Sequence, residues 1–136
     1  MLFADQGRDA LRRQWRDAWR RHCAGLPLEP LQAQIVDVVQ LHPEYHALLE
    51  STVAGDPPGA GEAFLHLALH LGLREQLGTD RPAGVGAIHR RLARTLGSPH
   101  AAEHRMIEVL ATTLWEAQRA GRAPDERDYL ERLQRL

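Results

Sequence analysis

The chain has 136 residues, of which 43% are hydrophobic and 26% charged, and its formal net charge is -1. These values are close to globular averages and exclude a chain that is disordered throughout, while the length is typical of one domain. The near-neutral charge argues against a general nucleic-acid or anionic-membrane binder, because such proteins need a basic excess. The single cysteine, Cys23, excludes an intrachain disulfide.

No apolar run reaches the roughly 18–20 residues that a membrane-spanning helix needs. The N-terminus has neither the basic region nor the apolar stretch of a signal peptide, so we expect a cytoplasmic protein. All 17 basic residues are arginine, and neither lysine nor asparagine occurs. This bias indicates a GC-rich, bacterial genome, and the lack of lysine removes lysine-based Schiff-base chemistry.

Apolar residues recur at helical spacing almost from end to end, and alternating apolar and polar runs are scarce. The sequence therefore predicts an all-α fold, with a bundle of about six or seven helices forming a single domain over residues 1–136. Capping residues, glycines and prolines place the helices at about 7–23, 29–41, 43–54, 61–77, 82–96, 99–120 and from 124 onward.

The helix expected over 61–77 is apolar on nearly every side, which is typical of a buried central helix. The three tryptophans, Trp15, Trp19 and Trp115, lie on apolar stripes and are expected in the core. The first helix carries an arginine-rich outer face. Nucleic-acid association through that face is the weakest functional hypothesis, because aspartates partly offset its charge and such runs are usually solvated.

The placement of the eight histidines is the most informative feature of the sequence. Six of them form pairs four residues apart, whereas random placement would give about half a pair. Residues four apart project from one face of a helix, so two imidazoles at this spacing can reach one metal ion. The pairs are His42 and His46, His66 and His70, and His100 and His104.

Helical phase places Glu103 at the centre of the apolar stripe of the helix expected over 99–120, among Met106, Ile107 and Leu110. An unpaired buried carboxylate costs several kcal/mol, so Glu103 needs a cationic, protonated or metal partner. Carboxylates and imidazoles from several helices are therefore expected to point inward.

The first hypothesis from this pattern is a metal site inside a helical bundle, where facing helices supply the ligands. Nitrogen and oxygen ligands suit zinc, iron, manganese or nickel, and the absence of paired cysteines argues against soft-ligand sites. Such a protein could be a metalloenzyme, in which the ion activates water or dioxygen or polarises a substrate. Glu62 and His100 are expected to orient the ligands. The candidate ligands are His46, His66, His70, Glu103 and His104.

The alternative hypothesis is a non-catalytic structural or interaction protein whose inward histidines hydrogen-bond to Glu103, Glu62 and backbone carbonyls. His42 is expected only to cap a helix, and Glu44 only to complement its dipole. The partner, a small molecule or another protein, is not identified by any motif, and neither is the oligomeric state.

Several short motifs together resemble an uncharacterised bacterial family, the domain of unknown function numbered eighteen forty-one. They are His42-Pro43-Glu44-Tyr45-His46, the stretch 64–71 (FLHLALHL), Arg74-Glu75-Gln76, Asp80-Arg81-Pro82, Glu103-His104 and Leu114-Trp115. The resemblance spans nearly the whole chain and implies a small bacterial protein. It implies no activity and assigns no site residues.

Overall fold

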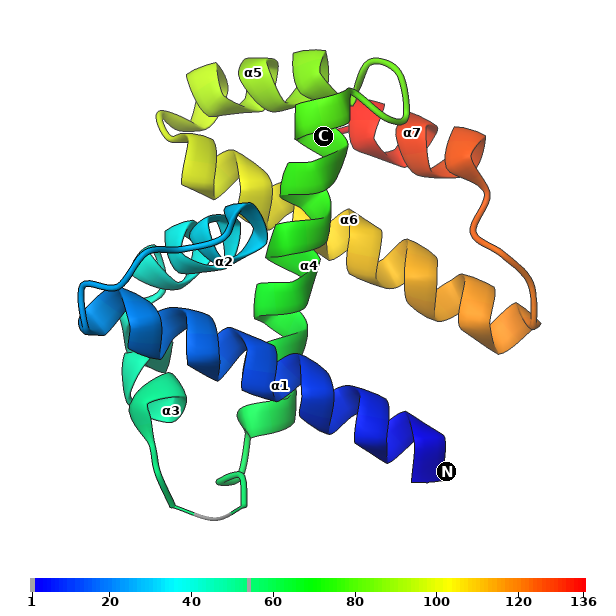
Figure 1. Cartoon of the computed structure of the whole chain (residues 1–136). Helices are drawn as coiled ribbons and strands as arrows, with labels where there is room; N and C mark the ends of the chain where they lie inside the picture. The colour runs from blue at the N-terminus through cyan, green and yellow to red at the C-terminus, as the bar shows by residue number, and fades with distance from the viewer. Residues whose placement is uncertain (1, 54) are drawn as a thin grey trace. The chain divides into compact units, whose positions relative to one another are not determined.

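The computed structural model describes residues 2–53 and 55–136. For residues 2–7 it describes the backbone alone. Seven α-helices, one short 3-10 helix and no strand lie within these residues, so the predicted all-α fold is confirmed (Figure 1). None of these helices combines the length and the apolar composition that crossing a bilayer requires. The α-helices are α1 (Leu2–Cys23), α2 (Pro30–Gln40), α3 (His46–Glu50), α4 (Ala60–Thr79), α5 (Val85–Leu96), α6 (Pro99–Ala120) and α7 (Glu126–Gln134).

Helix boundaries agree with the sequence prediction where a capping residue fixes them. Ser98 precedes α6, and its hydroxyl accepts a hydrogen bond from the backbone N–H of Ala101 at 3.2 Å. Gly121 follows α6 with a φ of 67°, a left-handed conformation that glycine adopts without steric cost. Ser98 and Gly121 therefore set the two ends of α6 in the predicted range. Between them the helix is regular, so the direction in which each side chain projects follows from its position in the sequence.

The predicted extent of the helix over residues 43–54 is wrong. Residues Pro43–Tyr45 form a 3-10 helix, and the α-helix that follows them ends at Glu50. Ser51 turns to an extended conformation, and its hydroxyl accepts a hydrogen bond from the N–H of Val53 at 3.3 Å. This local bond competes with the helical pattern and ends the helix early.

The chain divides into two compact units, residues 1–67 and 68–136, and α4 contributes residues to both. In the first unit, α1 packs against α2 and α3. Trp15 and Trp19 of α1 are buried, as predicted, and the indole N–H of Trp19 donates to Glu50 at 3.0 Å. Near the start of α4, the guanidinium groups of Arg12 and Arg16 both bind Asp56.

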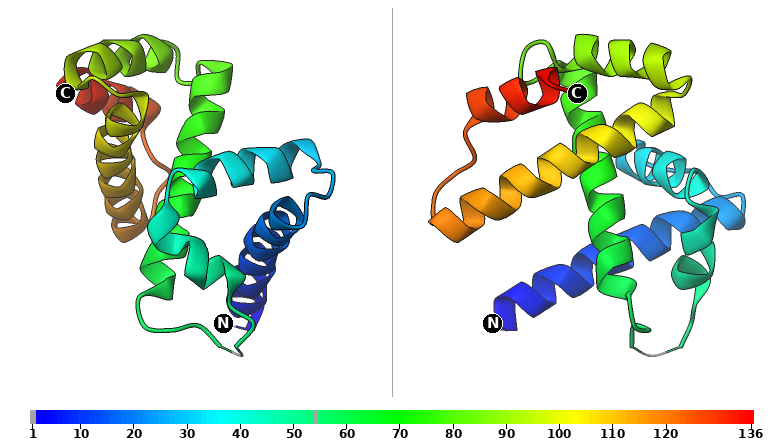
Figure 2. Two further views of the ribbon diagram at one scale, coloured as in Figure 1. Left: turned by 90° about the vertical axis from the view of Figure 1, so that its left-hand side faces the viewer. Right: turned by 180° about the vertical axis from the view of Figure 1, so that it is seen from behind.

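In the second unit, α5, α6 and α7 pack against one another, and Figure 2 shows the α5–α6 hairpin from two further sides. The buried hydroxyl of Tyr129 donates to Gln76 Oε1 at 2.8 Å, and burial raises the pKa of Tyr129 to about 12. Trp115 was expected in the core, but it is 56% exposed and lies under the guanidinium of Arg119. The core of the unit comprises Leu73, Val85, Ile88, Leu92, Ala102, Met106, Ile107, Leu110, Tyr129 and Leu133.

The predicted buried helix over 61–77 corresponds to α4, but its sides differ in burial. Leu67, His70 and Leu73 are fully buried at three-residue intervals, which places them on one side of the helix. Leu65 is 59% exposed, so the expectation of burial on nearly every side is wrong at this position. Glu62, expected to point inward, is also exposed.

Asp80 organises the turn between α4 and α5. Its carboxylate accepts hydrogen bonds from the backbone N–H groups of Gly86 at 2.9 Å and Gly84 at 3.3 Å. These donors include groups that the first turn of a helix leaves without a backbone partner. The Asp80-Arg81-Pro82 motif therefore has a structural use, because its first residue stabilises the start of α5.

We expect the pKa of Asp80 to lie below its ordinary value of 3.8, as measured by NMR titration of the carboxyl carbons. Hydrogen bonds from Gly86 and then Gly84 lower this pKa, and they outweigh the opposite effect of burial, while the charge of Arg90 lowers it further. The stabilisation is complete above pH 3.8 and is lost as the pH falls through the folded-state pKa. The Asp80→Asn variant identifies the resonance, and a pKa at or above 3.8 would contradict the role of Asp80.

Candidate metal centre

His70 lies on the buried side of α4 and is fully inaccessible to solvent. Its Nδ1 atom is 3.3 Å from Oε2 of Glu103, which projects from α6. Glu103 is itself only 6% exposed, as the helical phase of the sequence predicted. A carboxylate at one ring nitrogen holds an imidazole in a fixed orientation and directs its other nitrogen away from the carboxylate.

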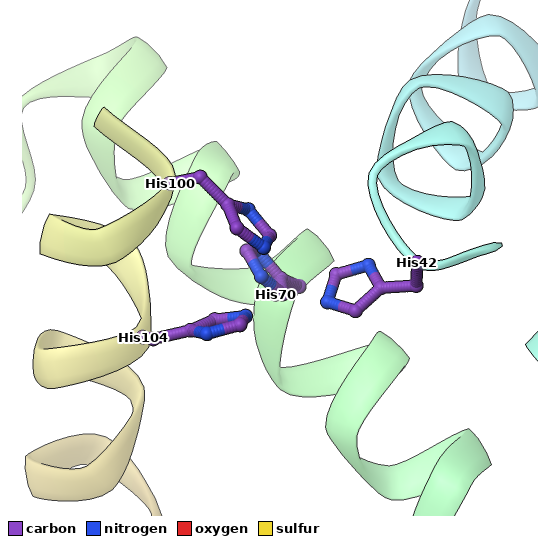
Figure 3. Close-up of side chains that lie close together, drawn as sticks. All are labelled: His42, His70, His100 and His104. Atoms are coloured by element: carbon purple, nitrogen blue, oxygen red, sulfur yellow. The ribbon is translucent and has the colours of Figure 1, made fainter. Parts of the chain in front are cut away.

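His100 and His104 lie one turn apart at the start of α6, and both are half-buried. The ring centroid of His70 is 5.1 Å from that of His100 and 5.0 Å from that of His104, and the latter two are 4.1 Å apart. Figure 3 shows these three imidazoles of the second unit pointing toward one another; the fourth ring drawn there, that of His42, belongs to the first unit. One ring nitrogen from each of the three lies within 4.8 Å of the others.

The charge of Glu103 is maintained despite its burial. Burial by itself raises the pKa of this carboxyl group, because it removes the charged form from water. The hydrogen bond with His70 and the positive charge of Arg74 lower the pKa by more, and the net result lies below the ordinary value of 4.5. The Nη2 atom of Arg74 is 3.4 Å from Glu103 Oε2. At neutral pH the carboxylate is therefore ionised and can polarise the His70 ring.

Three imidazoles this close together can do one of two things. They can share a metal ion, which each would bind as a neutral ring through one nitrogen. Without an ion they can form a packed hydrogen-bonded network, in which positive charges on neighbouring rings would repel one another. In a site with three histidine ligands, the nitrogens lie at about 2.0–2.1 Å from zinc.

The remaining predicted ligands lie in the first unit, where each has contacts of its own. The Nε2 atom of His66 is 3.1 Å from Nε2 of His42. His46 places its Nε2 atom 2.8 Å from the carbonyl oxygen of Val39, and its ring lies 4.4 Å from that of Trp19. Of the five predicted ligands, the second unit thus brings together His70, Glu103 and His104.

The sequence predicts an orienting role for His100 and a capping role for His42. The structure places the His100 ring against the other two imidazoles, and it buries His42 with its Nδ1 atom 2.7 Å from the carbonyl oxygen of Val38. His42 holds the predicted N-cap position of the 3-10 helix, and within the described residues its side chain makes no capping hydrogen bond there. The signal for its burial was present, because His42 follows Val38 by four residues and continues the apolar side of α2.

The chain belongs to the family described as Domain of unknown function (DUF1841), whose sequence profile matches residues 7–135. This match confirms the resemblance found in the motifs. No curated protein and no solved structure shows significant similarity to the chain. The family description names no activity.

Proposed function

We propose that this protein binds a divalent transition-metal ion through His70, His100 and His104, with Glu103 orienting His70. The observation that carries the proposal is the convergence of three ring nitrogens within 4.8 Å beside a buried carboxylate. Metal-binding histidines commonly donate their other ring N–H to a carboxylate, which fixes the tautomer and makes the ligating nitrogen more basic. The approach of His70 Nδ1 to within 3.3 Å of Glu103 Oε2 supports such a role. In this proposal Glu103 is a positioning residue rather than a ligand.

The donor set narrows the choice of metal. Three imidazoles suit zinc, iron or nickel, whereas manganese favours sites that are rich in carboxylates. Three protein ligands leave at least one coordination position for water or for another ligand, which is the arrangement of catalytic zinc sites. If an ion is held by His70, His100 and His104, the chemistry it would supply is activation of a bound water as a nucleophile near neutral pH. Zn²⁺ is therefore the first ion to test.

A second function is favoured by the contacts around Glu103. This carboxylate joins His70 and Arg74 of α4 to α6 through direct contacts of 3.3 Å and 3.4 Å. Such a buried polar network can fix the register of two helices in a structural or interaction protein. The two functions differ in whether the histidines bind metal, so a binding measurement separates them.

The test is metal analysis and Zn²⁺ titration of protein purified without a histidine tag. We expect one ion per chain. Replacing His70, His100 or His104 by alanine should weaken Zn²⁺ binding by more than about 100-fold, because the loss of a ligand costs more than the loss of a positioning residue, which costs up to about 100-fold. His22→Ala is the matched control, because the His22 ring contacts Gln40 and Trp19 in the first unit. A metal-free protein that does not bind Zn²⁺ at micromolar concentration would refute the proposal.

The same titration compares two ligand sets. The sequence alone favoured His46 and His66 as ligands, so it predicts that alanine at either position also abolishes binding. The arrangement in the second unit predicts that these two variants bind Zn²⁺ like the His22→Ala control, and that His100→Ala does not. If His100→Ala binds Zn²⁺ as tightly as the His22→Ala control, the ligand set His70, His100 and His104 is contradicted.

A further inference from the structure

Arg74 lies one helical turn after His70, on the same face of α4. Its guanidinium makes one long contact with Glu103, with 3.4 Å between Nη2 and Oε2. Its Nε atom is buried and makes no hydrogen bond within the part of the chain that the structure describes. A guanidinium has five N–H donors in a planar fork, so most of the hydrogen-bonding capacity of Arg74 is unused by the contact with Glu103.

The charges around the proposed site do not balance when it holds a divalent ion. Neutral imidazoles leave the two positive charges of the metal uncompensated. The negative charge of Glu103 is offset by the positive charge of Arg74, so the group as a whole keeps two positive charges. His70 and Glu103 are both buried, and an uncompensated charge is costly in such surroundings. An anion at the open coordination position would supply the missing compensation.

We infer that the metal site accepts a small oxyanion, a carboxylate or phosphate group, with Arg74 as its second point of attachment. The inference rests on the metal site proposed above and names its ligand class. Carboxylate and phosphate oxygens match the planar fork of arginine and form short, charge-assisted hydrogen bonds with it. The same oxyanions are hard donors that can bind a divalent ion. A buried, unsatisfied Nε beside the site is the group such a ligand would satisfy.

The experiment uses the full chain loaded with Co²⁺, whose visible absorption would change when the bound ion gains a further ligand. Acetate and inorganic phosphate are titrated separately, so that the two sources of oxyanion are distinguished. The Arg74→Gln variant removes the charge, and Arg74→Lys keeps the charge without the fork. Arg91→Gln is the control, since Arg91 lies on α5 and its guanidinium contacts the backbone oxygen of Gln134 at 3.5 Å.

We expect at least one of the two anions to shift the Co²⁺ spectrum of the wild type and of Arg91→Gln. In Arg74→Gln, Co²⁺ still binds but the anion binds about 10–100-fold more weakly, as the loss of a charge-assisted hydrogen bond predicts. The anion affinity of Arg74→Lys should lie between that of the wild type and that of Arg74→Gln. Protein without metal should bind neither anion measurably.

Other results would show whether the metal site or only the oxyanion site is wrong. If the wild type binds no Co²⁺, the proposed metal site fails and the oxyanion site fails with it. If Co²⁺ binds and neither anion changes its spectrum, or if Arg74→Gln binds anions like the control, only the oxyanion inference is overturned. Equal anion binding with and without metal would also overturn it, because the ion would then play no part.

Discussion

The Glu103→Gln variant should bind Zn²⁺ about 10–100-fold more weakly than the wild type, which is the usual effect of removing the partner of a metal-binding histidine. Glutamine has nearly the same shape and can still accept a hydrogen bond from His70. What it lacks is the negative charge that makes the opposite ring nitrogen of His70 more basic. Competition between the protein and a chelator of known affinity measures the change.

Unfolding measurements on the same variant separate the metal site from a purely structural network. In saturating Zn²⁺, a 10–100-fold loss of affinity lowers the free energy of unfolding by about 1.4–2.7 kcal/mol, because ligand binding stabilises the folded state by mass action. In excess chelator, the variant should lose less stability than in saturating Zn²⁺, because there the substitution removes only the contacts of Glu103 with His70 and Arg74. Glu108→Gln, an exposed position on the same helix, is the control and should be unchanged in both conditions.

An equal loss of stability with and without chelator would contradict the metal proposal. The network hypothesis predicts this outcome, with a cost on the order of 1–3 kcal/mol in both conditions, because Glu103 then serves only as the acceptor for His70 and Arg74. No loss in either condition would mean that the contacts of Glu103 contribute nothing to folding or to binding.

The burial of Glu103 was predictable because α6 is long and regular and has a capping residue at each end. Once Ser98 and Gly121 fix such a helix, each residue advances by about 100° and the buried side follows from the apolar residues alone. The same argument failed for Trp115 on that helix. Periodicity gives the direction of a side chain, but it does not say which turns of the helix another element covers, and Trp115 is 56% exposed.

Contacts between histidines of different helices were beyond the reach of the sequence. A spacing of four residues correctly puts His66 and His70 on one face of α4, but it does not identify the neighbour of either ring. His66 meets His42, which follows α2, and His70 meets Glu103 of α6. Such partners are decided by how helices distant in sequence pack, which no local pattern records.

The Leu73→Ala variant should lose about 2–5 kcal/mol of stability, the usual range for deleting a fully buried leucine side chain. Leu73 is 0% exposed and belongs to the core that α4 shares with α5, α6 and α7. The substitution removes apolar contacts and leaves a cavity that the surrounding helices fill only in part. Because small domains are stable by about 5–15 kcal/mol in total, urea unfolding will show a large shift of the midpoint.

Leu65→Ala is the matched control, since it makes the same chemical change eight residues earlier on α4. Leu65 is 59% exposed, and we expect its replacement to change stability by no more than about 0.5 kcal/mol. If Leu73→Ala does not fold, Leu73→Met nearly conserves the volume and should cost less than about 1.5 kcal/mol. Similar losses for alanine at positions 65 and 73 would contradict the distinction between the two sides of α4. That distinction also underlies the metal proposal, because the buried side that carries Leu73 is the side that holds His70.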